Sequence, residues 1–336
     1  MSTRTSVSQL FSRDEITALT TKSDWMGAYA VGFTWSVIGL TFAAVALVWP
    51  HVGSAVRLLL CVLAVIILAG RQLALGILTH DAAHGSLFKT KWLNDHLTDW
   101  LCARPVWNNL HQYRPYHLKH HAKTSTADDP DLLLVAGLPT TRRSMLRKFV
   151  RDVSGLTGLK FVAGRVLMDL GFIEWTVTNQ IKKIPQAGRA WYDYPISFLR
   201  NSGATLITNG ILFGLLWASG HPMLYVLWLL AYVTPFPLFI RIRSMAEHAD
   251  REESTDVFKN TRTTKAGLLA RLLVAPINVN FHVEHHLMAS VPYFRLPKMH
   301  RLLRERNHVA EPAGYLEVLA QLSSQPHTPS KQQSSS

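Results

Sequence analysis

Apolar residues are gathered into four long runs instead of being spread evenly along the chain. The runs cover residues 25–49, 54–78, 203–219 and 222–240, and each is close to the length of a helix that crosses the apolar core of a bilayer. Only residues 50–53 separate the first two runs, and only Gly220 and His221 separate the last two. The pattern predicts an all-α integral membrane protein whose four transmembrane helices form two tight hairpins.

Polar segments flank and divide these runs. Residues 1–24 are mostly polar and resemble no secretory signal; a short helix is expected from Ser12, because Ser12 and Glu15 have the spacing of a capping box. Residues 25–322 are expected to form one membrane-embedded domain, in which helices between the spans make a cytoplasmic cap. Residues 323–336 are rich in Ser and Gln and are predicted to be a disordered tail.

Two further stretches have an intermediate pattern. Lys91–Trp107 is amphipathic and predicts one helix at the membrane surface, with a core-packing helix as the alternative. Phe161–Ile181 is moderately apolar but contains Arg165, Asp169 and Glu174. Those charges make it too polar for a span, so it is expected to lie at the interface or on the cytoplasmic cap.

The distribution of charge orients the predicted spans. The chain has 35 Lys and Arg against 22 Asp and Glu, a net charge of +13. Seventeen of the basic residues lie in 79–200, thirteen lie from 241 onward, three precede residue 25, and the two hairpin turns have none. The positive-inside rule therefore places both termini in the cytoplasm, with a bacterial inner membrane as the expected location. Since topology accounts for this charge, no nucleic-acid partner is expected.

Three short clusters contain eight of the sixteen histidines: His80-Asp81-Ala82-Ala83-His84, His117-Leu118-Lys119-His120-His121 and His282-Val283-Glu284-His285-His286. Residues at i, i+3 and i+4 share one helix face, so each cluster can direct several imidazoles toward one point. The predicted topology places all three on the cytoplasmic side. One such cluster is often a polar patch at a helix end, but three together indicate metal binding.

The number of imidazoles indicates two metal ions, because a single zinc site needs three or four protein ligands. The ligand type alone leaves iron, zinc, copper and nickel open. The only cysteines, Cys61 and Cys102, do not form a C-x-x-C motif. Breaking unactivated C–H bonds of an apolar substrate at a membrane requires an oxidant, which favours iron acting with oxygen.

The three clusters, in this order around paired spans, resemble the three histidine boxes of membrane fatty acid desaturases, and residues 292–300 (PYFRLPKMH) also resemble that family. The resemblance implies a non-haem di-iron centre with two Fe ions, O2 as co-substrate and a fatty acyl or lipid substrate. Two electrons per turnover would come from an external ferredoxin, rubredoxin or cytochrome. No bound flavin or haem is expected, since the chain has neither a G-x-G-x-x-G nor a C-x-x-C-H motif.

The resemblance also implies a ligand set. Its members are His80, His84, His117, His120, His121, His282, His285 and His286, together with His248 as the further histidine that the family commonly has upstream of its third box. Some members have an asparagine four residues before that histidine to hold a water, but this chain has Ser244, which leaves Asn278 or Asn280 as candidates.

Carboxylates beside the proposed ligands can fix imidazole tautomers, although solvated surface charge is the alternative for each. The candidates are Asp81, Glu247, Glu284 and the acidic run Asp128, Asp129 and Asp131. The remaining histidines, including His300, are expected to be structural or exposed. Arg71 lies inside the second span and either has a role with substrate or extends to the membrane surface.

Other functions stay open. A hydroxylase or ketolase acting on a lipid, carotenoid or alkane would use the same scaffold. A membrane metal transporter or sensor is a remote alternative, because the predicted spans contain no histidine. A zinc-dependent membrane hydrolase is a third. Basic residues such as Arg142, Arg143, Arg147 and Lys148 could dock an acidic electron donor.

Overall fold

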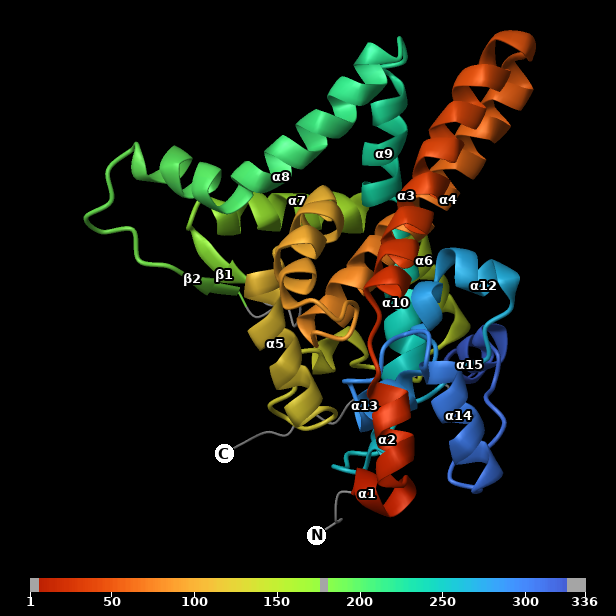
Figure 1. Ribbon diagram of the computed structural model, residues 1–336. Helices are drawn as coiled ribbons and strands as arrows, with labels where there is room; N and C mark the ends of the chain where they lie inside the picture. Colours follow the sequence, from red (N-terminus) through yellow and green to blue (C-terminus); the bar gives the residue numbers. More distant parts are fainter. Residues whose placement is uncertain (1–5, 176–180, 325–336) are drawn as a thin grey trace.

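The computed structural model describes residues 6–175 and 181–324, and it is mostly helical (Figure 1). Its α-helices are α1 Val7–Leu10, α2 Arg13–Thr20, α3 Asp24–Val48, α4 Ser54–Ala83, α5 Leu110–Lys123, α6 Arg142–Val153, α7 Leu156–Asp169, α8 Asp193–Ala218, α9 Leu224–Val233, α10 Pro235–His248, α11 Val257–Asn260, α12 Leu268–Leu273, α13 His282–Leu287, α14 Leu296–Glu305 and α15 Tyr315–Leu322. Short helical turns are η1 Trp49–His51, η2 Leu93–Leu97, η3 Asp99–Ala103, η4 Arg104–Val106, η5 Leu132–Leu134 and η6 Pro276–Asn278. Most of the predicted disordered tail, residues 325–336, lies outside the described residues.

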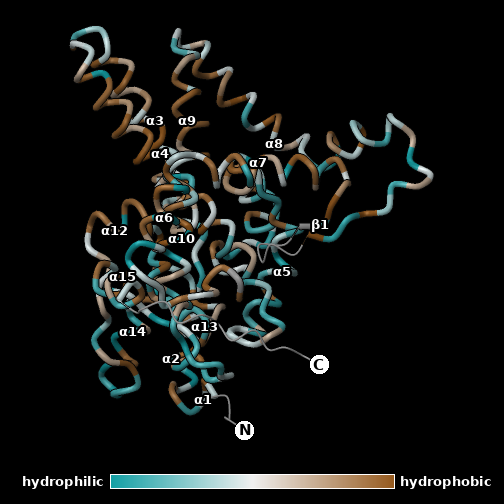
Figure 2. Tube along the Cα trace, turned by 180° about the vertical axis from the view of Figure 1, so that it is seen from behind, coloured by the Kyte–Doolittle hydropathy of each residue, from teal (hydrophilic) through white to brown (hydrophobic). Residues whose placement is uncertain are grey.

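Three helical stretches are long and apolar enough to cross a membrane: Asp24–His51, Ser54–Ala83 and Leu224–His248. They correspond to the first, second and fourth predicted spans, and Figure 2 shows apolar residues concentrated along α3, α4 and α9. The third predicted span lies within α8, which contains polar residues such as Asn209 and is not among the three. The third predicted span, and with it the total of four spans, therefore stays a prediction.

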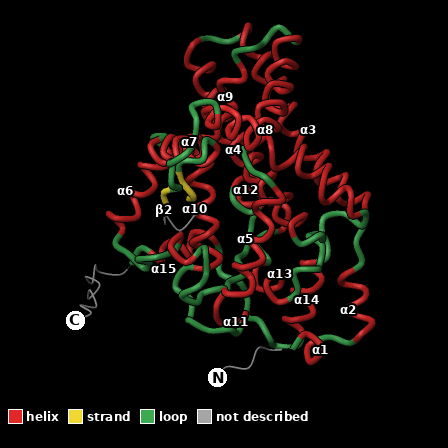
Figure 3. The backbone as a smooth tube through the Cα atoms, turned by 90° about the vertical axis from the view of Figure 1, so that its left-hand side faces the viewer, coloured by secondary structure: helices red, strands yellow, loops and turns green. Residues whose placement is uncertain are grey.

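The helices α3 and α4 form the first predicted hairpin, with η1 as its turn. Their shared core includes Ile38 and Phe42 of α3 and Leu68 of α4, all buried. In the second hairpin, α9 packs on α4 as well as on α8. The central position of α4 therefore brings both hairpins onto one helix (Figures 1 and 3).

Two of the apolar helices continue beyond their predicted ends. The second span was predicted to end at Leu78, but α4 continues to Ala83. The fourth was predicted to end at Ile240, but α10 continues to His248 after a break at Thr234 and Pro235. Proline at the start of α10 costs no hydrogen bond, because the first amides of a helix have no partner within it. These extensions carry histidines directly from the apolar helices.

The short N-terminal helix was predicted correctly. Ser12 caps α2, since the amide of Glu15 donates to Ser12 Oγ at 3.2 Å and the amide of Ser12 donates to Glu15 Oε2 at 2.8 Å. Leu19 is fully buried, and α2 packs on α14. The N-terminal segment is thereby attached to the part of the chain that follows the third histidine cluster.

The stretch Lys91–Trp107 is helical as predicted, although it is not a regular α-helix. It forms the π-helical turns η2 and η3 and the 3₁₀ turn η4. Buried polar side chains hold these turns: Asp99 accepts from the Leu110 amide at 2.9 Å and from Arg104 Nε at 2.8 Å. Irregular turns of this kind allow side chains to point where a regular helix would not place them.

The expectation of an all-α chain was also wrong for one small element. After α7, the strands β1 Ile173–Trp175 and β2 Ile181–Lys183 pair in antiparallel register. Asp169, at the end of α7, is buried and accepts from Trp107 Nε1 at 2.9 Å and from the hydroxyl of Ser202. These contacts explain how a charged residue is tolerated within an otherwise apolar segment.

Arg71 does not extend to the surface. Its side chain is buried within α4, and its guanidinium donates to the carbonyl of Leu272 in α12. The neighbouring Gly70 lies against the same carbonyl, so the two segments approach closely. The observed role of Arg71 is to attach α12 to α4, and the structure does not test a role with substrate.

Candidate metal centre

Four helices bring all nine proposed ligands together. His80 lies in the last turn of α4 with His84 as its C-cap, and α10 ends at His248. The second cluster lies on α5, whose N-terminus is capped by Asn109, and the third lies on α13. Segments separated by more than two hundred residues therefore meet at one end of the apolar helices (Figure 1).

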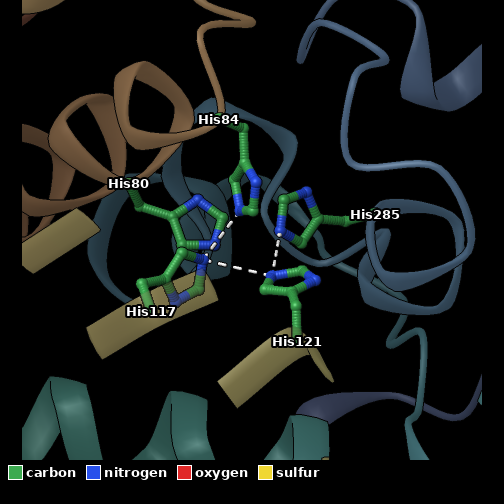
Figure 4. Close-up of side chains that lie close together, drawn as sticks. All are labelled: His80, His84, His117, His121 and His285. Carbon is green, nitrogen blue, oxygen red and sulfur yellow. Dashed lines mark hydrogen bonds between the residues drawn. The ribbon is translucent and has the colours of Figure 1, made fainter. Parts of the chain in front are cut away.

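The first histidine group consists of His80, His84, His117, His121 and His285, and a ring nitrogen from each lies within 4.8 Å of the others. Figure 4 shows these five side chains pointing toward a common point. Nε2 of His117 is 2.8 Å from Nε2 of His84 and 3.1 Å from Nε2 of His121. Nε2 of His285 is 3.0 Å from Nε2 of His121. Such convergence places several imidazole donors around one small space.

The second histidine group consists of His120, His248, His282 and His286, with Glu247 beside them. His120, His248 and His286 can share one ion, and so can Glu247, His248 and His282. Nε2 of His282 lies 2.8 Å from Nε2 of His248. The two groups meet because each of the second and third clusters contributes to both.

Burial favours the neutral form of several imidazoles in these groups. It lowers the pKa of His117, His282, His285 and His286 well below the usual value, and neighbouring histidines act in the same direction. Burial lowers the pKa of His84 to about 4. Neutral imidazole is the form that binds a metal ion, so these five histidines are in the form that binds one at neutral pH.

Two buried carboxylates accept hydrogen bonds from imidazoles of the proposed ligands. Nδ1 of His80 donates to Asp81 Oδ1 at 2.9 Å, and Nδ1 of His120 donates to Asp129 Oδ1 at 2.8 Å. Each contact leaves Nε2 of that ring directed toward its group. Asp128, by contrast, is exposed and pairs with Lys123. In the acidic run, Asp129 is therefore the residue that contacts His120 directly, while Oδ2 of Asp131 lies 3.7 Å from Nδ1 of His120.

The two predicted glutamates have different surroundings. Glu247 accepts from Arg243 Nε at 2.8 Å, while its other oxygen is 3.6 Å from Nε2 of His282. Glu284 is fully buried and turned toward other partners: its carboxylate accepts from Nδ1 of His300 at 2.6 Å and from the hydroxyl of Thr263 at 2.5 Å. Glu247 is thus close enough to join an ion, whereas Glu284 holds α13 in place.

His300 was expected to have no role, and sequence reasoning missed its contact with Glu284. The only signal was its place at the end of residues 292–300, the stretch that resembles desaturases. Thr263, the second partner of Glu284, also accepts from the amide of Val283 at 3.1 Å. Both contacts join distant parts of the chain to the first turn of α13.

The two asparagine candidates bind backbone groups. Asn278 donates to the carbonyl of Tyr293 at 3.1 Å, and Asn280 donates to the carbonyl of Thr264 at 2.9 Å. Oδ1 of Asn280 is buried without a hydrogen-bond partner among the described residues. A role for either residue in holding a metal-bound water stays a prediction.

The donor set fits two transition-metal ions. Nε2 of His80 and Nε2 of His286 are buried and have no hydrogen-bond partner within the described ranges, a costly arrangement for a polar nitrogen unless a ligand completes it. Imidazole nitrogen is suited to iron, zinc, copper and nickel, and two groups of this size suit two ions. The geometry therefore supports two ions close together.

Comparison with known proteins agrees with this geometry. A family model described as fatty acid desaturase matches residues 56–315, which include all nine histidines. The chain is also 26% identical over 249 residues to dihydrorhizobitoxine desaturase from Bradyrhizobium elkanii; the match covers 71% of this chain and spans 66% of the length of that relative. Because the family model covers most of the sequence, the chain belongs to the fatty acid desaturase family.

Proposed function

We propose that this protein is a membrane-bound non-haem di-iron desaturase, which uses O2 and two external electrons to introduce a double bond into a fatty acyl chain. The single observation that carries the proposal is the convergence of nine histidines, six of them buried, into two groups at the ends of apolar helices. Family membership supports the desaturase type of chemistry. The overall reaction converts two neighbouring CH2 groups, O2, two electrons and two protons into one CH=CH unit and two waters.

Each of the two histidine groups would hold one of the two ions. One ion would be held by His80, His84, His117, His121 and His285, and the other by His120, His248, His282 and His286 with Glu247 nearby. When bound, the iron pair supplies the oxidising power that removal of hydrogen from an unactivated carbon requires. Integral membrane placement, with both termini and the metal centre in the cytoplasm, is part of the same proposal.

The protein's own groups prepare this site. Asp81 and Asp129 accept hydrogen bonds from Nδ1 of His80 and His120, respectively. These hydrogen bonds fix the tautomer and orientation of both rings before a metal ion binds. The ion pair with Arg243 offsets part of the free-energy cost of burying the Glu247 carboxylate beside the second histidine group. Burial of six of the proposed ligands limits the contact of bulk water with a reactive oxidant.

Electrons must reach the centre from a separate protein, because the sequence has no motif for flavin, haem or iron–sulfur binding. A ferredoxin, rubredoxin or cytochrome is the proposed donor class. Basic residues exposed on α6, including Arg142 and Arg143, would suit an acidic donor.

Product analysis tests the function. Membranes containing the protein are supplied with an acyl substrate, an electron donor and O2, and the products are identified by mass spectrometry. We expect an alkene, two iron ions per chain, and loss of both iron and activity in His120→Ala and His285→Ala. His221→Ala, in an exposed turn, is the control and should retain both. A hydroxylated product without any alkene would contradict desaturation, and a fully active zinc form would contradict the iron centre.

A further inference from the structure

Glu247 lies at its neighbouring histidine in a different way from Asp81 and Asp129. Those two carboxylates each contact Nδ1 of a histidine, at 2.9 and 2.8 Å, which leaves Nε2 of that ring for a metal ion. Oε2 of Glu247 instead lies 3.6 Å from Nε2 of His282. The same nitrogen of His282 is 2.8 Å from Nε2 of His248. The carboxylate of Glu247 is therefore beside the nitrogen that would bind the ion, and the two aspartates are on the opposite side of their rings.

The distance between Glu247 and His282 fits two ligands of one ion. A hydrogen bond between a ring nitrogen and a carboxylate oxygen is about 2.7–3.2 Å long, so the observed 3.6 Å is too long for one. Two ligands that are each about 2.1 Å from a metal ion, at about 90–120° to one another, lie about 3.0–3.6 Å apart. One donor atom each from Glu247, His248 and His282 lie within 4.8 Å of one another. These three side chains can thus surround one ion.

The other oxygen of this carboxylate is already engaged. Oε1 of Glu247 accepts from Nε of Arg243 at 2.8 Å, and the two residues are one turn apart in α10. Only 3% of the side-chain surface of Glu247 is exposed, so bulk water contributes little to the stability of its charge. The ion pair aligns the carboxylate with one oxygen toward Arg243 and the other toward His282.

The charge around the second histidine group also favours an anionic ligand. The first group contains five imidazoles, whereas the second contains four. A divalent ion held only by four neutral imidazoles, close to the guanidinium of Arg243, would add positive charge to a region that is largely buried. A carboxylate between the ion and the guanidinium would offset part of that charge and would give the second ion a fifth donor.

We propose that Oε2 of Glu247 is a direct ligand of the second ion, which is then held by four imidazoles and one carboxylate oxygen, while the first ion is held by five imidazoles. This inference rests on the proposed function for the presence of two ions, but it assigns a donor that the histidine pattern does not contain. Because carboxylate is anionic and harder than imidazole, the two ions have chemically different surroundings.

Metal titration tests this assignment without any turnover. Purified full-length protein in a neutral detergent is freed of metal and titrated anaerobically with ferrous iron against a chelator of known affinity. Glu247→Gln keeps the size of the side chain and removes its charge, so it should bind one ion as the wild type does and the other at least about tenfold more weakly. Glu247→His supplies a nitrogen donor and should recover the second ion. Both variants lose the ion pair with Arg243, so the difference between them reports ligation.

Infrared difference spectroscopy detects the carboxylate itself. The stretching bands of a carboxylate shift when one of its oxygens binds a metal ion, so iron-loaded minus iron-free protein should show a band from Glu247. The band should be lost in Glu247→Gln and in Glu247→His. It should remain in Arg243→Gln, which removes the ion-pair partner and keeps the carboxylate. Thermal unfolding of the metal-free variants shows whether each is folded, and if Glu247→Gln is not, the wild type and Glu247→His give the same spectroscopic comparison.

Three results would overturn the assignment of Glu247 as a ligand. These are unchanged binding of both ions in Glu247→Gln, an equal loss of the second ion in Glu247→Gln and Glu247→His, and a difference spectrum that does not depend on Glu247. Failure of the proposed function has other signs: the wild type would bind a single ion, or would form a hydroxylated product without any alkene. Neither sign changes whether the carboxylate band depends on Glu247.

Discussion

Nδ1 of His300 lies 2.6 Å from Oε1 of Glu284. Glu284 belongs to the third histidine cluster, but it is not among the residues of either histidine group. Because Glu284 is fully buried, loss of its partner would leave part of a carboxylate without a hydrogen bond in a region of low polarity. We expect His300→Ala to lower the free energy of unfolding by about 1–3 kcal/mol and to reduce iron content. Thermal unfolding in detergent and iron analysis measure the two effects.

His300→Asn is the conservative control, since its side-chain amide can donate from nearly the position of Nδ1. It should restore much of the stability and iron content. Equal stability and iron content in His300→Ala and the wild type would show that the contact does not support α13.

The adjacent residues Asp128 and Asp129 form a matched pair. Asp129 is buried and accepts from Nδ1 of His120, whereas Asp128 is exposed and pairs with Lys123. Asp129→Asn should weaken iron binding about 10- to 100-fold, the range typical for loss of a group that orients a ligating histidine. Asp128→Asn should leave it unchanged. Competition with a chelator of known affinity measures both, and equal behaviour of the two variants would contradict the tautomer assignment.

The depressed pKa of the buried histidines predicts loss of stability in acid for the metal-free protein. The pKa of His84 is lowered from 6.5 to about 4, so the unfolded chain binds the proton more readily than the folded one between these values. The free energy of unfolding should therefore fall as pH decreases from 6.5 toward 4, by up to about 1.4 kcal/mol per pH unit for each such histidine. His84→Gln should give a flatter curve. Denaturant titrations with chelator present measure the two slopes, and equal slopes in the wild type and His84→Gln would contradict the prediction.

Close packing at Gly158 predicts a specific steric effect. A Cβ atom at this position in α7 would lie 2.2 Å from the carbonyl oxygen of Val233 in α9, a contact with backbone that cannot easily move. Gly158→Ala should destabilise the protein by about 1–3 kcal/mol. Gly210→Ala in α8, where no atom lies within 4 Å, is the control and should be neutral or slightly stabilising. Thermal unfolding distinguishes the two variants.

Chemical labelling tests the predicted topology, including the unsettled span in α8. Single cysteines are introduced at His51, His221 or Ser144 in a chain whose Cys61 and Cys102 are replaced by alanine. An impermeant maleimide applied to intact cells should label the first two positions, because both are expected outside, and should not label Ser144→Cys. Protection of His221→Cys with labelling of His51→Cys would contradict the second hairpin.

The meeting of the histidine clusters was predictable because the predicted topology places all three clusters on the same side of the spans. The division of the clusters between two groups also follows helix geometry: His117 and His121 are four residues apart and enter the first group, whereas His120 points to the second. In the third cluster the same spacing places His282 and His286 in the second group and His285 in the first.

Other features depend on tertiary contacts that no local pattern contains. The π-helical turns after Lys91 are held by Asn94 and Asp99, whose partners include the backbone of Phe88 and Leu110. The contact of His300 with Glu284 joins α14 to α13 through side chains sixteen residues apart. Hydrophobic periodicity reports which face of an element is buried, and it does not report which buried polar groups meet.

The extension of α10 to His248 has a consequence for the biogenesis of the protein. By the time the ribosome has made α5, four of the five histidines of the first group exist, but the second group has only His120. The first group is complete only at His285 and the second only at His286, and His248 arrives at the end of an apolar helix. Under the proposed function, insertion of the last apolar helix and assembly of the metal centre would therefore be linked, because a nascent chain that ends before His285 holds neither complete histidine group.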